Sequence, residues 1–173
     1  MKKVILATLI SGVMSASALA ASAGNGTVSF SGSIISAPCS IAPGEENQEV
    51  PLGQVSDVTL KAGGASSAQP FSIKLEGCNL EKDNIVKVTF NGTEEVTGET
   101  NTGLLRITGD ASGAAVKIMN TSGAQINVNS EYQQQYVKGD NELKFTAALQ
   151  GIKGGAVVPG NFTAVTNFTL AYE

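Results

Sequence analysis

The last dozen residues of the chain alternate between apolar and polar side chains with almost no break. The even positions are apolar or small: Phe162, Ala164, Thr166, Phe168, Leu170 and Tyr172. The odd positions suit solvent, among them Asn161, Thr163, Asn167 and Thr169. This period of two predicts a long β-strand that buries one side fully. Such a strand at a terminus must lie beside another segment, because otherwise it is an exposed edge prone to aggregation.

Shorter runs of the same kind recur along the chain, at residues 71–75, 85–90, 104–107, 116–119, 126–128 and 143–149. Turn-forming pairs separate them: Asn91-Gly92, Thr102-Gly103, Gly109-Asp110, Ser122-Gly123, Gly139-Asp140 and Gly154-Gly155. Residues 62–69 are expected to form a flexible loop, and no internal repeat or interdomain linker is visible. Short strands at regular spacing, with almost no helical signal, predict an all-β sandwich. The chain has no Trp, so the core Trp of antibody domains is absent.

The N-terminus has the three-part layout of a secretory signal peptide. Lys2 and Lys3 precede a mostly apolar stretch, residues 4–13, and small residues follow at 15–23. The apolar stretch is about half the roughly 20 residues that a membrane-spanning helix needs, and no later run is long enough, so we expect a soluble mature protein without a membrane span. Cleavage is predicted after Ala23, with Ala20 as the other small-x-small site. The alternative is an N-terminal helix that stays on the protein.

Charge and composition argue against several function classes. The formal charge is 11 − 15 = −4, and removal of the two N-terminal lysines makes it 9 − 15 = −6, which disfavours nucleic-acid binding. The chain contains no His, the commonest general base and metal ligand. The carboxylate pairs Glu45-Glu46 and Glu94-Glu95 are formally open to catalysis but are typical of solvated loops. No phosphate-binding glycine motif is present, so no enzyme activity, cofactor or metal is expected.

Two cysteines, Cys39 and Cys78, lie in the mature region. An even number in an exported chain predicts one disulfide. Two free thiols are the alternative, which an oxidising compartment disfavours.

A second alternating segment precedes the first cysteine. Val28, Phe30, Gly32 and Ile34 alternate with serines, and residues 24–26 before them are expected to be flexible. One interpretation is the first strand of the chain's own sheet. Gly32 complicates it, because glycine inside a strand weakens the strand and often marks the close approach of another backbone.

These features together resemble the chaperone–usher fimbrial subunits, of the type 1 and P pilus major-pilin kind. Tyr172 is penultimate and Gly160 is fourteenth from the end, as in those pilins. Residues 70–78 resemble the family's strand leading into its second cysteine, and residues 26–32 followed by Cys39 resemble its N-terminal extension and first cysteine. The resemblance covers essentially the whole chain.

The resemblance implies an incomplete immunoglobulin-like β-sandwich that lacks its final strand and is completed by donor-strand exchange, a form of β-strand addition. Residues 1–23 would be the signal peptide, 24–37 the donor-strand extension and 38–173 the pilin domain. On the donor, Val28, Phe30 and Ile34 would fill pockets, and Gly32 would lie where the groove is shallow. The strand at the groove edge, which also meets the chaperone, would carry Gly160, Phe162, Phe168, Leu170 and Tyr172.

The implied function is a structural subunit that builds the shaft of an extracellular surface fimbria and supports adhesion. The implied partners are neighbouring copies of the chain, a periplasmic chaperone, an outer-membrane usher, and tip or adaptor subunits. A minor adaptor subunit of the same kind of fibre is the alternative, and abundance on purified fibres distinguishes the two. A sugar-binding tip adhesin is disfavoured, because such adhesins carry a binding domain in front and are roughly twice as long.

Overall fold

A computed structural model describes residues 25–80 and 84–173 of the chain. The predicted signal peptide, residues 1–23, lies outside the described residues. The chain divides into two units, Met1–Ile34 and Ile35–Glu173. The described part of the first unit, residues 25–34, forms no helix or strand. No helix in the described ranges is long and apolar enough to cross a membrane.

Strands are the main regular elements of the second unit. Its strands are β1 (Ser40–Ile41), β2 (Gln69–Cys78), β3 (Ile85–Asn91), β4 (Glu94–Thr97), β5 (Thr100–Arg106), β6 (Thr108–Gly109), β7 (Ala114–Met119), β8 (Gln125–Ile126), β9 (Glu131–Gln135), β10 (Gly139–Gly151), β11 (Phe162–Thr163) and β12 (Asn167–Tyr172). One helical turn, α1 (Asp57–Leu60), continues into the short 3-10 helix η1 (Lys61–Gly63). The prediction of an all-β chain is confirmed.

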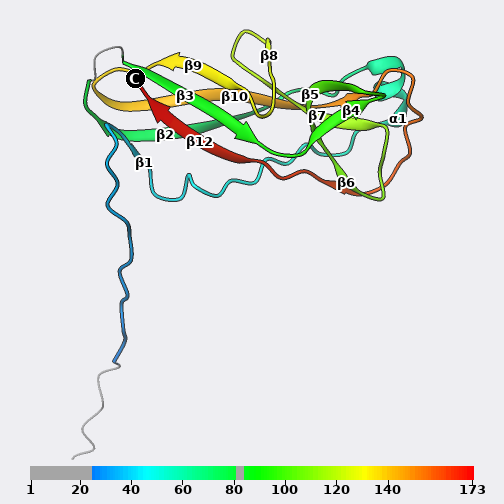
Figure 1. Ribbon diagram of the computed structural model, residues 1–173. Helices are drawn as coiled ribbons and strands as arrows, with labels where there is room; N and C mark the ends of the chain where they lie inside the picture. The colour runs from blue at the N-terminus through cyan, green and yellow to red at the C-terminus, as the bar shows by residue number, and fades with distance from the viewer. Residues whose placement is uncertain (1–24, 81–83) are drawn as a thin grey trace, which may run out of the picture. The chain divides into compact units, whose positions relative to one another are not determined.

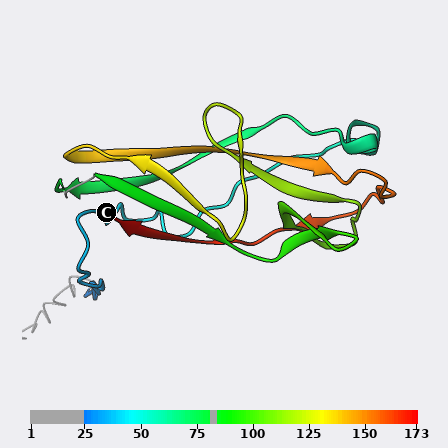
Figure 2. The same ribbon diagram turned by 45° about the horizontal axis from the view of Figure 1, so that its top comes forward.

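The strands form two main antiparallel sheets that face each other (Figures 1 and 2). The large sheet has the order β1-β2-β10-β7-β5-β4, with β8 beside β7. The small sheet has the order β12-β3-β9, and β11 pairs with β6 in a separate two-stranded sheet. In Figure 2, β2 and β10 lie on one side of the domain, and β3 and β12 lie on the other.

Alternating side chains from both sheets make one core. In β3 the even residues Val86, Val88 and Phe90 are buried, as the alternation of residues 85–90 predicts. Phe145 of β10 is 1% exposed, and its ring centroid lies 5.2 Å from that of Phe90, edge to face. Such an aromatic pair contributes about 0.5–1.5 kcal/mol beyond the apolar area that it buries. The two sheets are therefore joined by aromatic packing.

The turn signals were less accurate than the strand signals. Thr102-Gly103, predicted as a turn, lies inside β5, where Gly103 has a positive φ of 74°. The prediction is wrong because the hairpin turn falls at residues 98–99, between the paired Thr97 and Thr100. Gly139-Asp140 also lies inside a strand, at the start of β10, where the register to β2 shifts. Both glycines mark irregularities within strands rather than their ends.

The predicted disulfide joins Cys39 and Cys78, so this prediction is confirmed. Cys39 directly precedes β1, and Cys78 ends β2. Because β1 has only two residues, the disulfide is the stronger tie between the start of the domain and the large sheet.

Replacing both cysteines by serine should lower the free energy of unfolding by about 4 kcal/mol, because a cross-link across roughly 40 residues restricts the unfolded chain. Urea unfolding of the mature chain would measure this. Reductant added to the unsubstituted chain is the matched control and should give the same shift. An unchanged midpoint in both would contradict the prediction.

Candidate functional site

The C-terminal strand is paired along one edge only. β12 lies at the end of the small sheet and pairs with β3 (Figure 1). Glu173 and Ile85 exchange both backbone hydrogen bonds, at 3.0 and 3.2 Å. Because such pairs alternate along an antiparallel ladder, the N–H and C=O groups of Phe168, Leu170 and Tyr172 point away from β3. Within residues 25–80 and 84–173, no strand pairs with this side of β12.

A second segment of the domain, residues 49–55, also has unpaired backbone. Residues 49–55 belong to no helix or strand, and no backbone group in the described ranges hydrogen-bonds to theirs. Leu52 and Val55 are half-buried against the core. Pro51, which lies between Val50 and Leu52, is exposed. A proline within such a segment is typical of an edge strand, because it cannot donate a ladder hydrogen bond.

A groove of about 1270 Å³ lies between residues 49–55 and the segment that leads into β12. Residues 46–55 form one wall, residues 157–168 form the other, and the floor comes from core side chains of both sheets: Phe71, Ile73, Phe90, Leu105, Ile107, Val116, Ile118, Ala147 and Leu149. Small-molecule pockets typically measure about 300–1,000 Å³. The groove thus exceeds the usual size for a small ligand and exposes part of the hydrophobic core.

Burial alternates without a break from residue 161 to residue 173, as the sequence predicts, but the even positions are half-buried rather than fully buried. The prediction of full burial was wrong, because no strand of the described chain covers the outer edge of β12. The predicted single strand is also interrupted, since β11 ends at Thr163 and β12 begins at Asn167. At the interruption the Thr166 hydroxyl donates to the Asn91 carbonyl, at 3.1 Å.

The structure divides the predicted groove-edge residues between two hollows. Gly160, Phe162 and Phe168 line the large groove. Leu170 and Tyr172 instead line a smaller pocket of about 450 Å³, together with residues 36–38 and Glu173. Burial raises the pKa of the Tyr172 phenol, with a smaller contribution from Tyr136, whose ring lies 5.8 Å from that of Tyr172.

Gly160 lies close to the backbone of Asp110 and Ala111. A Cβ built on this residue would lie 2.7 Å from the Ala111 nitrogen and 2.8 Å from the Asp110 carbonyl carbon. Asn161 next to it accepts backbone hydrogen bonds from Asp110 and Ala111, at 2.9 and 3.1 Å. The position therefore needs glycine so that the wall of the groove can pack against residues 110 and 111.

The predicted donor residues all lie in the described segment 25–34. Their apolar side chains are exposed: Val28 by 75%, Phe30 by 92% and Ile34 by 104%. A Cβ on Gly32 would meet no atom within 4 Å. The segment thus leaves most of the surface of its large apolar residues exposed, which is unfavourable in water.

Sequence reasoning missed the wall formed by residues 49–55. The available signal was Val50 and Leu52 alternating around Pro51, which is too short to predict a strand. It also did not identify the floor of the groove, because floor residues have the same pattern as any core residue. In the described residues, no group of three or more Cys, Asp or Glu side chains could hold a metal ion.

A family model described as "Fimbrial protein" matches residues 28–173. The chain is 48% identical over 162 residues to the major MR/P fimbria protein of Proteus mirabilis, covering 93% of this chain and 91% of that protein. It is 44% identical over 175 residues to the fimbria A protein of Serratia marcescens, covering 100% and 99%.

Two solved structures are similar to the chain throughout the domain. One is a chaperone–usher pilus, with a TM-score of 0.77, 31% identity, and coverage of 87% of this chain and 97% of that one. The other is the P pilus rod subunit PapA, with a TM-score of 0.68, 30% identity, and coverage of 79% and 100%.

Replacing Gly160 by alanine should destabilise the domain by about 1–3 kcal/mol, the usual cost of overpacking, because the added methyl group meets backbone atoms. Gly155→Ala is the matched control, since a Cβ there lies at an ordinary 3.4 Å from its nearest neighbour. Thermal unfolding of the two variants measures the difference. Equal midpoints would show that residues 110 and 111 move aside without cost.

Proposed function

The chain belongs to the fimbrial protein family and is a structural subunit of a bacterial surface fimbria, and from this premise we propose that residues 24–37 form a donor strand that fills the groove of a neighbouring copy. The family is one of structural pilins, exported through the periplasm to the cell surface. The fold is an incomplete immunoglobulin-like sandwich. In this proposal, residues 38–173 are the accepting pilin domain, and the chain is not an enzyme.

The observation that carries the proposal is the groove with two unpaired walls. A strand inserted between β12 and residues 49–55 can form backbone hydrogen bonds on both sides. It also covers the core side chains on the floor, which favours a donor with apolar residues on one face. The segment containing Val28, Phe30 and Ile34 has this pattern.

The lengths of donor and wall agree. Six residue steps separate Val28 from Ile34, and six separate Phe162 from Phe168 on the wall. At roughly 3.3 Å per residue, both segments span about 20 Å. Full burial of the three large donor side chains, at roughly 1.5–3 kcal/mol each, gives a gross gain on the order of 5–9 kcal/mol. The entropy lost when the segment becomes ordered offsets part of this gain.

The geometry favours a donor from another copy over the chain's own segment. Residues 36–38 lie beside Tyr172 at the end of β12, so the chain's own residues could enter the groove only from that end. They would then run parallel to β12. The sheets of an immunoglobulin-like sandwich are antiparallel, and parallel pairing is slightly less stable per residue. A second copy can present the segment in the antiparallel direction, with Ile34 toward Gly160.

The same groove supports a proposal for the other partners. Before assembly, the open edge of β12 and the exposed core need a temporary cover, which a periplasmic chaperone would supply. Exchange for the donor strand would take place at an outer-membrane usher, and the finished shaft would contact tip or adaptor subunits and support adhesion. A minor adaptor subunit would share the groove and the donor segment. Abundance on purified fibres separates it from a shaft subunit.

Replacing Phe30 by aspartate should abolish fibre growth, because the donor would place a charge in an apolar pocket. Ser31→Asp is the matched control: it adds the same charge on the opposite face of the donor and should leave fibres. Electron microscopy of protein sheared from the cell surface gives the readout. Equal fibre yields from both variants would contradict the proposed pattern of inward residues.

Replacing Gly32 by leucine should leave the unassembled subunit as stable as before, because no atom lies within 4 Å of a Cβ at this position. Assembly should slow at least several-fold, since the donor backbone approaches the groove floor closely at its glycine. The measurement is the rate at which purified subunits form polymer, with Ser33→Leu as the control. An unchanged rate for Gly32→Leu would mean that no close approach occurs there.

A further inference from the structure

The wall formed by residues 49–55 begins where the chain leaves the large sheet. β1 ends at Ile41, and Ala42 donates the last backbone hydrogen bond to β2, to the Lys74 carbonyl at 2.9 Å. The Ser72 carbonyl, two residues along β2, points to the same side. Pro70, two residues further, has no N–H to offer at this edge. Beyond Ala42 the edge of β2 therefore has no backbone partner in the described chain.

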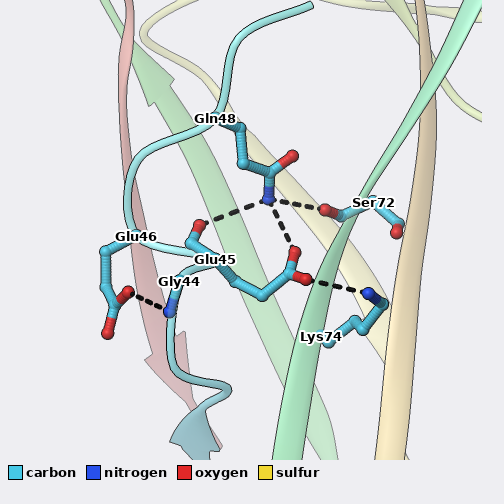
Figure 3. A network of polar contacts seen from close by, with 6 residues as sticks. All are labelled: Gly44, Glu45, Glu46, Gln48, Ser72 and Lys74. Carbon is cyan, nitrogen blue, oxygen red and sulfur yellow. Dashed lines mark hydrogen bonds and ion pairs between the residues drawn. The ribbon is translucent and has the colours of Figure 1, made fainter.

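The side chain of Gln48 occupies this place instead. Its amide nitrogen donates to the Ser72 carbonyl at 2.7 Å, and it also lies 2.9 Å from a Glu45 carboxylate oxygen and 3.2 Å from the Glu45 carbonyl (Figure 3). The other carboxylate oxygen of Glu45 accepts from the Lys74 ammonium, at 2.9 Å. The turn before it is fixed by Gly44, whose N–H donates to the Glu46 carboxylate at 2.9 Å.

The hydrogen bond from the Gln48 side chain to the Ser72 carbonyl affects the backbone of residues 49–55. A strand that continued along β2 would use its own N–H and C=O groups for the ladder. Because the Gln48 amide satisfies the Ser72 carbonyl, the backbone of residues 49–55 stays free of β2 and lines the groove. Hydrogen bonding to Glu45, with the charge of Glu45 as a second cause, raises the pKa of Lys74, so the ammonium group stays charged at neutral pH.

We propose that Gln48 is a positioning residue for strand exchange: it fastens residues 44–48 to β2 so that residues 49–55 present an unpaired wall to the incoming donor. This inference rests on the proposed function, since it assigns a role in donor capture. Without the amide, residues 49–55 must be ordered during capture. The entropy cost of that ordering then opposes donor binding.

Gln48→Glu tests the proposal, because glutamate has the same shape but cannot donate and is repelled by Glu45. Full-length mature chain is refolded by dilution in an excess of a labelled peptide of residues 25–36, and peptide uptake is followed by fluorescence anisotropy. We expect uptake to slow about three- to tenfold, as for the loss of one net hydrogen bond. Amide exchange in residues 49–55 should be faster, and the melting midpoint of the peptide-filled subunit should change little.

Two further variants keep the result interpretable. Gln48→Ala removes the donor without adding charge and should slow uptake to a similar degree. Gln133→Glu makes the same change on an exposed residue of β9 and should have no effect. If Gln48→Glu and Gln48→Ala take up the peptide at the unsubstituted rate, the role of Gln48 is overturned. A lower melting temperature that accounts for the slower uptake would overturn it as well. No uptake by the unsubstituted chain would instead overturn the proposed function itself.

Discussion

The backbone of β12 has partners on one side only, and this constraint organises the rest of the domain. Its N–H and C=O groups bond to β3 at every second residue, and the groups of Phe168, Leu170 and Tyr172 point away from β3. Because unpaired backbone groups are costly once water is removed, this edge of β12 favours contact with solvent or with another strand. The half-burial of the even C-terminal residues follows from this single missing neighbour.

The opposite wall is held open by different means. Residues 49–55 would compete for the edge of β2, but the short β1, Pro70 on β2 and the Gln48 amide keep the two apart. One wall is therefore an edge strand already in place, and the other is an extended segment that lacks a partner. In the proposed assembly, an incoming strand with period-two apolar residues would fit both, since its backbone would meet two edges and its side chains would meet the floor.

Much of this architecture could be predicted from the sequence, because strands with one buried face carry a strong local signal. Residues 85–90 and 143–149 lie in strands whose burial follows the pattern, and the C-terminal alternation does so in β12. β9 (Glu131–Gln135) was not predicted, since Tyr132 is its only large apolar residue and pairing to β3 determines its structure. The wall at residues 49–55 and its anchor at Gln48 depend on contacts between distant segments. No local pattern encodes them.

The position of the disulfide has a mechanical consequence for a fibre built from such subunits. Tension along the fibre would enter each domain from the extension, at residues 35–38, and leave through the groove that holds the next donor. The next residue on this path is Cys39, which is bonded covalently to Cys78 at the end of β2. Load would therefore pass directly into the large sheet, bypassing the two-residue β1, and pull on the long β2–β10 ladder in shear.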